Sequence, residues 1–245
     1  SIRDSLQNRA EAAPQLITLD GAAGTGKTSL ARSLASLLGL KYLDTGAMYR
    51  AVALAFLQAD AAPTADAAGA LLPNLRIDIW YAGGEMRVLL NGDDVSSIVR
   101  RQSVGAMASK VSQLAAVRDK LVDEQRRIAS EREAAEGGVV LDGRDMGTVV
   151  FPNADLKIFM VADVAVRAQR RQAEYAEQGR SVPIEEVRQE IIERDRQDRE
   201  RELSPLQKAE DAIELDTTDR TIAEQVDFVV QHVRAQQAEG TNPAL

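Results

Sequence analysis

Short apolar runs alternate with longer segments of helical periodicity along most of the chain. The first run, residues 16–20, is rich in β-formers and ends at Gly21, which predicts a buried strand that feeds a tight turn. Residues 28–38 then repeat leucines at helical spacing up to a glycine. A second short strand at 42–44 precedes an alanine-rich helix at 46–58. This order of strand, glycine loop, helix, strand and helix is typical of the opening of a parallel α/β sheet.

The middle of the chain has a different pattern. Residues 75–80 and 86–90 alternate in strand fashion around Gly83 and Gly84, which predicts a small β-hairpin inserted into the α/β pattern. From about 103 to 134 the chain contains no proline and is predicted to be helical, with an apolar face formed by Val111, Leu114, Val117, Leu121 and Ile128.

Parallel-sheet signals return in the last third of the chain. Strands are predicted at 139–142 and 156–161, and a helical segment rich in Arg and Glu follows them. A last strand at 212–216 leads into an amphipathic helix at 221–235. The sequence therefore predicts an α/β protein with a parallel sheet, a small β insert and a charged helical segment.

Residues 21–28 read Gly-Ala-Ala-Gly-Thr-Gly-Lys-Thr and satisfy the GxxxxGK[ST] phosphate-loop pattern between a predicted strand and a predicted helix. Glycines allow successive N–H groups to converge on an anion. Lys27 can then bridge the β- and γ-phosphates of a nucleoside triphosphate, and the Thr28 hydroxyl can bind Mg²⁺. A glycine-rich turn without a ligand is the alternative, and a dinucleotide site is disfavoured because the GxGxxG order is missing.

Asp142 ends the apolar strand that begins at Val139, where P-loop folds place a second metal-polarising carboxylate. A strand-end aspartate is as often a turn residue, so both roles stay open. The chain has no Asn-Lys-x-Asp motif and no Leu-Ser-Gly-Gly-Gln motif. Their absence disfavours a GTPase switch and a transporter ATPase.

Three charged segments beyond the loop are candidates for binding a second substrate. Arg50 lies one and a half turns into the helix after the second strand, and residues 142–148 follow a strand at the carboxyl edge where open α/β sheets bind ligands. Arg194, Asp198 and Arg201 share one face of a helix at i, i+4 and i+7, so two guanidinium groups flank a carboxylate. The alternatives are a capped helix with an exposed arginine, a solvated turn and a solvated helix face.

Composition narrows the chemistry that these residues can perform. The chain has no Cys and a single His, which excludes thiolate sites, Cys nucleophiles and most imidazole chemistry. That histidine, His232, is far in sequence from every motif, and we expect it at the surface or in helix packing. The net charge of −8 disfavours nucleic acid or an acidic membrane as a partner. Residues 1–14 lack the apolar core of a signal peptide, and no stretch reaches ~20 apolar residues, so we expect a cytoplasmic protein.

Taken together, these motifs resemble the bacterial cytidylate kinases, which are nucleoside monophosphate kinases. The similarity extends from Ile17 to the last helix and is carried by the segments 43–50, 91–95, 109–112, 142–152 and 194–201. It implies a P-loop NTPase fold with three α/β/α layers around a parallel sheet. It also implies three parts, which are a core (15–45, 137–165 and 205–238), a monophosphate-binding domain that contains the β insert (46–136) and a helical lid (166–204).

The resemblance also implies a site. The ATP-binding residues would be Gly21, Ala22, Ala23, Gly24, Thr25, Gly26, Lys27, Thr28, Ser29 and Arg170. Mg²⁺ would bind, directly or through water, at Thr28 and Asp142. The residues that bind CMP or dCMP would be Asp44, Thr45, Arg50, Ser109, Arg118, Arg144, Asp145, Arg194, Asp198 and Arg201. Of these, Ser109 and Arg118 would face the cytosine and Asp198 the ribose, and the catalytic residues would be Lys27, Arg144 and Arg201.

The loop departs from the family pattern Gly-Pro-Ser-Gly-Ala-Gly-Lys-Gly-Thr after the lysine, where this chain has Thr28 and Ser29. The general P-loop spacing favours Thr28 as the metal ligand, and Ser29 is the alternative.

The implied reaction moves the γ-phosphoryl group of ATP to CMP or dCMP. It needs no general base, because a phosphate monoester with a second pKa of about 6 is already an anion at neutral pH. Closure of the lid would exclude water. A kinase for a small-molecule hydroxyl, with Asp44 or Asp145 as its base, is one alternative, and a nucleotide-gated binding module is another. We expect a monomer whose partners are ATP and the monophosphate.

Overall fold

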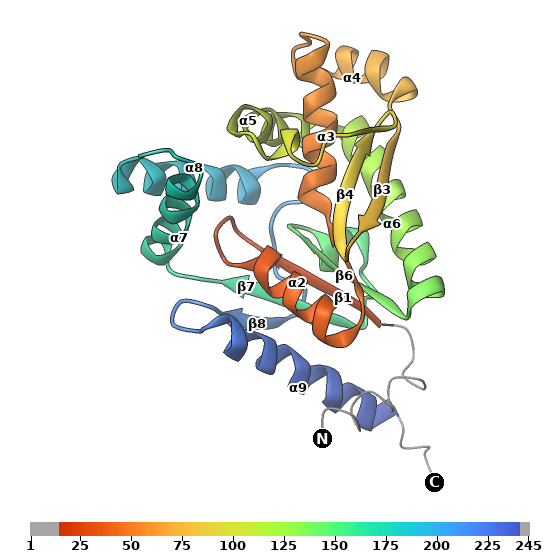
Figure 1. Cartoon of the computed structure of the whole chain (residues 1–245), viewed down its shortest axis with the longest axis vertical. Coiled ribbons are helices and arrows are strands. Elements are labelled where there is room, and N and C mark those ends of the chain that lie inside the picture. The colour runs from red at the N-terminus through yellow and green to blue at the C-terminus, as the bar shows by residue number, and fades with distance from the viewer. Residues whose placement is uncertain (1–14, 241–245) are drawn as a thin grey trace.

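Five parallel strands form the central sheet, in the order β2-β6-β1-β7-β8 (Figure 1). The computed structural model describes residues 15–240, so the expectation about residues 1–14 lies outside the described residues. The strands are β1 (Gln15–Gly21), β2 (Lys41–Asp44), β6 (Gly138–Gly143), β7 (Leu156–Val161) and β8 (Ile213–Asp216). The predicted parallel sheet is confirmed. Because β1 is the central strand, the glycine loop that follows it opens at the middle of the carboxyl edge.

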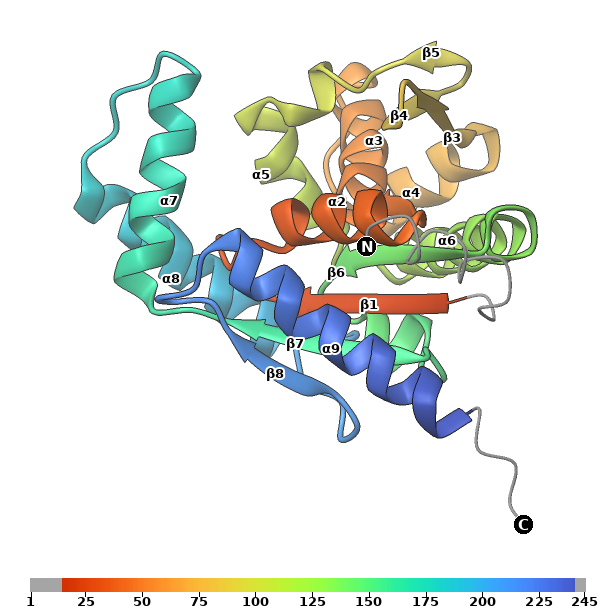
Figure 2. The ribbon, with the colours of Figure 1, turned by 60° about the horizontal axis from the view of Figure 1, so that its bottom comes forward.

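Helices cover both faces of the sheet, which makes the three layers that were predicted. One face carries α2 (Lys27–Leu38) and α9 (Ile222–Gly240), and the other carries α3 (Thr45–Gln58) and α6 (Ala115–Glu136) (Figures 1 and 2). Successive strand residues point to opposite faces. Val140 accordingly packs with α2 and α9, whereas its neighbour Leu141 packs with α3 and α6.

The segment between α3 and α6 contains the predicted hairpin together with a third strand that the sequence pattern did not predict. The antiparallel sheet is β3 (Ile77–Ala82), β4 (Glu85–Leu90) and β5 (Asp93–Asp94). The helices and 3₁₀ turns around it are α4 (Ala65–Leu71), η2 (Leu72–Asn74), η3 (Ile98–Arg100) and α5 (Gln102–Val111).

The prediction of continuous helix from about 103 to 134 is wrong, because a turn at residues 112–114 separates α5 from α6. Ser112 Oγ donates to the carbonyl oxygen of Ser109 at 2.9 Å. A hydroxyl that bonds back to the preceding turn competes with the helical ladder. The next helix then starts with the N–H of Arg118 bonded to the carbonyl of Leu114.

The largest hydrophobic cluster runs without a break from the sheet into the inserted segment. It joins Leu141 of β6 and Met146 to buried residues of α3 and α6, and it continues to Ile77 of β3 and Val88 of β4. The insert therefore shares its core with the sheet.

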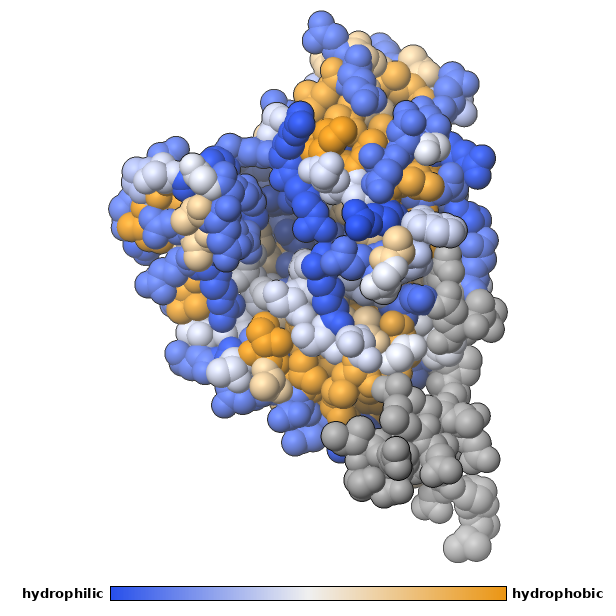
Figure 3. Space-filling view, in the orientation of Figure 1, coloured by the Kyte–Doolittle hydropathy of each residue, from blue (hydrophilic) through white to orange (hydrophobic). Residues whose placement is uncertain are grey.

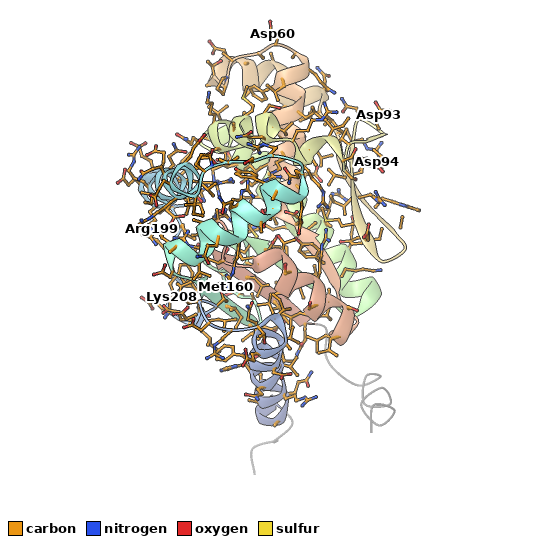
Figure 4. All side chains as sticks on the ribbon, turned by 60° about the vertical axis from the view of Figure 1, so that its left-hand side comes forward. Asp60, Asp93, Asp94, Met160, Arg199 and Lys208 are labelled. Carbon is orange, nitrogen blue, oxygen red and sulfur yellow. The ribbon has the colours of Figure 1, made fainter. Side chains whose placement is uncertain are left out.

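The segment rich in Arg and Glu forms two helices, α7 (Val164–Glu177) and α8 (Ile184–Glu200), which project from the sheet as a hairpin (Figure 1). Its buried side chains form a small separate cluster of Ala168, Tyr175, Val187 and Ile191. Charged side chains cover its outer surface, where Arg199 is exposed at the periphery (Figure 4). The α7–α8 hairpin thus has its own small core.

Two expectations drawn from composition can be compared with the fold. His232 packs within α9, where its Nδ1 lies 2.8 Å from the carbonyl oxygen of Phe228 and its ring centroid lies 4.6 Å from that of Phe228. This confirms the packing role. Among residues 15–240, no helix has the length and apolar character that a membrane span requires.

Candidate active site

The phosphate loop joins β1 to α2 at the centre of the sheet. Gly24 and Gly26 have φ angles of 77° and 94°. These left-handed conformations favour glycine and let successive N–H groups converge on one point. Arg170 links the loop to the segment after β8, because its guanidinium donates to the carbonyl oxygen of Gly24 at 3.4 Å and to that of Thr217 at 2.6 Å.

Lys27 is the first residue of α2, and its side chain turns back over the loop. Its Nζ donates to the carbonyl oxygen of Ala22 at 2.7 Å and lies 3.4 Å from Thr25 Oγ1. Lys27 is only 7% exposed. Burial and the neighbouring Arg144 lower the pKa of Lys27 well below its ordinary value, while Asp142 and Asp198 oppose them. An anion beside Lys27 would therefore relieve unfavourable electrostatics.

Asp142 and Thr28 meet beside the loop. Thr28 Oγ1 donates to Asp142 Oδ2 at 3.0 Å, and Thr45 Oγ1 donates to the backbone carbonyl of Asp142 at 2.6 Å. Burial and the nearby carboxylate of Asp44 raise the pKa of Asp142 to about 7. A hydroxyl and a carboxylate held side by side at a phosphate loop are the donor types that Mg²⁺ prefers. The residues present fit the implied metal, and the contact with Asp142 favours Thr28 over Ser29 as its ligand.

A cluster of three guanidinium groups surrounds one carboxylate between the sheet and α8. Arg144 Nε donates to Asp198 Oδ2 at 2.7 Å, and Arg201 lies 4.0 Å from the other oxygen of Asp198. The buried atoms Arg194 Nε and Arg201 Nη2 have no hydrogen-bond partner within residues 15–240. Burial and Arg144 lower the pKa of Arg194 to about 10. Positive charge therefore exceeds negative charge in this cluster.

The structure brings the residues of the predicted helical face together, although the helix is shorter than the pattern predicts. It ends at Glu200, and Arg201 is its C-cap with φ −61° and ψ 138°. Because this φ is still helical, the Arg201 side chain stays beside Asp198, and its Nη1 lies 4.0 Å from Asp198 Oδ1.

Other predicted acceptor residues form an ion pair, a hydrogen bond to α8 and a helix cap. Arg118 forms a buried ion pair with Asp145, and Ser109 Oγ donates to Gln197 Oε1 of α8 at 3.3 Å. Asp44 caps α3 by accepting the N–H of Ala47 at 3.0 Å.

Most of these groups line one cavity of about 720 Å³. Figure 3 shows it as a hollow with hydrophilic walls between the α7–α8 hairpin and the rest of the molecule. Its walls include every residue predicted for the acceptor, which are Asp44, Thr45, Arg50, Ser109, Arg118, Arg144, Asp145, Arg194, Asp198 and Arg201. The phosphate loop contributes Ala23, Gly24, Gly26, Lys27, Thr28 and Ser29, whereas Gly21, Ala22, Thr25 and Arg170 lie behind this surface.

Residues 17–235 match the sequence profile of the cytidylate kinase family. This chain belongs to the cytidylate kinase family. A protein named cytidylate kinase from Salinibacter ruber is 54% identical over 226 residues, which cover 92% of this chain and 100% of that one. Another from Geobacter sp. is 43% identical over 227 residues, with coverage of 92% and 95%. A gluconokinase structure from Sinorhizobium meliloti is similar with a TM-score of 0.48 and 13% identity, and covers 94% of this chain and 98% of that one.

Membership of the cytidylate kinase family makes this protein a kinase, and the structure adds residues around its cavity that the motifs did not reveal. Asp20 is buried in β1, where its carboxylate accepts the N–H groups of Met146 at 2.9 Å and Gly147 at 2.7 Å. It thereby fixes the segment that carries Arg144 and Asp145 to the strand that ends at the phosphate loop. The signal in the sequence for this role of Asp20 was a single acidic residue within an apolar strand.

Arg167 is the second such residue. It forms a bidentate pair with Asp195 at 3.0 and 2.7 Å and donates to the carbonyl oxygen of Ala23 at 3.2 Å. It therefore links α7, α8 and the phosphate loop. One arginine within a charged helical segment gave no signal of this role.

Proposed function

We propose that this cytidylate kinase family member transfers the γ-phosphoryl group of ATP to the phosphate of CMP or dCMP, giving ADP and the diphosphate. The observation that carries the proposal is that Arg194 Nε and Arg201 Nη2 are buried without hydrogen-bond partners among the described residues and belong to side chains that line the same cavity as Lys27. Buried donors without partners are costly, and phosphate oxygens accept from guanidinium groups in a bidentate manner.

The acceptor chemistry suits the residues of the cavity. A monophosphate is an anion at neutral pH and attacks without a base. The requirement is to neutralise two polyanions and the charge of the transferring group. Lys27 on the donor side and Arg144, Arg194 and Arg201 on the acceptor side supply that positive charge, and we assign Lys27, Arg144 and Arg201 the catalytic roles.

The base and the sugar would be held beyond the arginine cluster. We assign Ser109 and the Arg118–Asp145 pair to the cytosine and Asp198 to the ribose, as the resemblance implies. The short Arg118–Asp145 contact supports this assignment because it fixes the direction of both side chains in the cavity wall. The assignment of Arg50 to phosphate is supported by its burial, which lowers its pKa.

We propose that Mg²⁺ is held by Thr28 and Asp142. When bound, the ion neutralises charge on the β- and γ-phosphates. The role of the protein is to hold the hydroxyl and the carboxylate together, and their 3.0 Å contact supports that role.

We propose the three-part division in which the α7–α8 hairpin closes over the cavity as a lid. Its separate cluster supports this division, since a unit with its own core can move as a body. Closure would exclude water, which would otherwise accept the phosphoryl group.

We also propose that the protein acts as a monomer in the cytoplasm. All the groups assigned to the two nucleotides come from one chain, so a second copy is not needed to complete the cavity. The proposed phosphoryl donor is ATP, and this supports the cytoplasm as the compartment.

The alternative function, a kinase whose acceptor is a small-molecule hydroxyl, is less well supported. Such an acceptor would need one of two carboxylates as its base. Asp44 is engaged as the cap of α3, and Asp145 is paired with Arg118. Each carboxylate thus has one oxygen engaged in a structural contact, which makes it less suited to act as a general base.

The test is ADP formation with CMP, dCMP, UMP, shikimate and a panel of polyols. We expect turnover with CMP and dCMP. Arg194→Gln should raise the KM for CMP by about 10- to 100-fold, because a charge-assisted hydrogen bond is lost. The matched control is Arg196→Gln on the exposed face of the same helix, where Arg196 pairs with Glu193 and Glu200. Turnover with a polyol alone, or equal effects of the two variants, would refute the proposal.

A further inference from the structure

The hydroxyl of Tyr42 occupies an unexplained position in the wall of the cavity. Tyr42 lies in β2, and its ring packs with Leu30 and Leu34 in the cluster between the sheet and α2. The residue is 8% exposed, and its buried Oη makes no hydrogen bond of ordinary geometry within the described part of the chain, although the side chain of Thr28 lies near it. Other tyrosine hydroxyls are satisfied, since that of Tyr81 donates to the Tyr42 carbonyl oxygen at 2.8 Å and that of Tyr175 donates to Glu190 at 2.9 Å.

Packing alone does not account for this hydroxyl. A phenylalanine would fill the same space without burying a polar atom, and a buried hydroxyl that lacks a partner is destabilising. An unsatisfied buried polar group in a cavity wall therefore points to a ligand that completes its hydrogen bonds.

The surroundings of the hydroxyl indicate which ligand this is. Tyr42 lines the same cavity as Thr28, Asp44 and Asp142. Burial, followed by the carboxylates of Asp142 and Asp44, raises the pKa of Tyr42, and a hydrogen-bonding interaction with the side chain of Thr28 lowers it. The phenol therefore faces the hydroxyl and the carboxylate assigned to the metal. A phenol O–H can donate one hydrogen bond and accept another.

We propose that Tyr42 is a positioning residue of the metal site, whose hydroxyl binds a water molecule on the Mg²⁺ that accompanies ATP. The inference rests on the proposed function. Mg²⁺ keeps several of its waters when it binds to proteins, and these waters need hydrogen-bond partners. Partners of this outer kind orient the inner ligands, and their loss typically weakens metal binding by 10- to 100-fold.

The experiment is a comparison of wild type with Tyr42→Phe by titration calorimetry, using the β,γ-imido analogue of ATP with Mg²⁺ and, separately, with EDTA. We expect the variant to bind the magnesium complex about tenfold more weakly and the metal-free analogue with unchanged affinity. Free Mn²⁺ measured by electron paramagnetic resonance, with the analogue present, should show the same weakening.

Tyr81→Phe is the matched control, because it removes a hydroxyl that is bonded to the backbone of Tyr42 and lies outside the cavity wall. It should leave the dependence on metal unchanged. The Tm of Tyr42→Phe should equal or exceed that of wild type, because the variant no longer buries an unpartnered hydroxyl. A lower Tm with unchanged metal affinity would make the hydroxyl structural and overturn the inference.

The remaining outcomes are also decisive. Equal weakening with Mg²⁺ and with EDTA would place the hydroxyl on the nucleotide and not on the metal, which overturns the inference. If wild type binds the analogue equally well with and without Mg²⁺, the assigned metal site itself fails. If wild type does not bind the analogue at all, the proposed function fails.

Discussion

Lys27 and Arg194 carry positive charge in places where burial and a neighbouring arginine both disfavour it. Both have lowered pKa values, and Arg144 contributes to each. The folded protein pays for this arrangement in stability, because like charges are held together out of water. The polyanions of the proposed reaction would remove that repulsion, so the side chains need little rearrangement when charge develops.

At Lys27, we expect substitution by alanine to lower kcat by about 10²- to 10³-fold, as loss of a comparable electrostatic donor does. The KM for CMP should change little, because Lys27 lies on the donor side. Steady-state kinetics with both substrates varied provides the measurement. Turnover within about threefold of wild type would contradict the assignment of Lys27 to the phosphoryl group.

Asp20 should make stability depend on pH in a defined direction. Burial raises its pKa from 3.8 to about 6, although the N–H bonds from Gly147 and Met146 lower it. Between these values the folded protein keeps a proton that the unfolded chain has lost. The stability from this group is therefore present below the unfolded pKa and is lost as the pH rises through the folded pKa.

Asp20→Asn should remove this dependence of the free energy of unfolding on pH. We expect the difference in free energy of unfolding, wild type minus Asp20→Asn, to fall by about 2 kcal/mol from about pH 4.5 to about pH 7. Urea unfolding at a series of pH values measures it. A difference that does not vary with pH would show that Asp20 titrates normally.

At the scale of elements, the α7–α8 hairpin is joined to the phosphate loop through Arg167. The same guanidinium reaches Asp195 of α8 and the carbonyl oxygen of Ala23. Both members of the ion pair are buried, at 4% and 7% exposure. Arg167 thus forms a direct contact path between α8 and the loop that does not require a bound substrate.

Asp195→Asn should destabilise the hairpin by about 3–5 kcal/mol, because it leaves the Arg167 charge buried without a counterion. Glu193→Gln breaks an exposed ion pair with Arg196 on the same helix and should leave stability almost unchanged, because solvent screens that pair. Hydrogen exchange of the α8 amides in the two variants measures the effect. Similar protection in both would mean that the Arg167–Asp195 pair is not what holds the hairpin.

Much of the element order could be predicted from the sequence, because burial imposes simple periods. The bounds of β7 agree with the prediction, and β1 and α2 differ by a residue or two. The break at residues 112–114 was missed because it is formed by local side-chain and backbone hydrogen bonds that leave no periodic signal in the sequence. The acceptor residues that lie in motifs were predicted to gather around one opening, and they line one cavity. Contacts between distant segments, such as Asp20 with Met146 and Arg167 with Asp195, follow no sequence periodicity. They could therefore not be predicted from the sequence.

On the scale of the whole molecule, a net charge of −8 coexists with a cavity lined by arginines. Acidic residues such as Asp60, Asp93 and Asp94 lie at the periphery (Figure 4). The cavity wall carries both signs, with basic side chains in excess, and a concave wall focuses its field at the opening, so the local charge governs the approach of an anionic substrate.

The dependence of kcat/KM for CMP on salt distinguishes local from global charge. We expect kcat/KM to fall several-fold as KCl rises from about 50 to about 500 mM, because screening weakens the attraction of the cavity. The kcat should change less. An increase in kcat/KM with salt would show that repulsion by the net negative charge dominates.

The inserted segment and the α7–α8 hairpin differ in how readily each could be exchanged between related proteins. The insert shares Leu141 and Met146 with the sheet, so grafting a foreign insert would require matching shapes on both sides of the junction. The α7–α8 hairpin keeps its four central side chains to itself. In a chimera, the apolar core of the hairpin should therefore transfer as a unit if the contact of Arg167 with the phosphate loop is kept, whereas the insert should be exchanged together with the part of the sheet on which it packs.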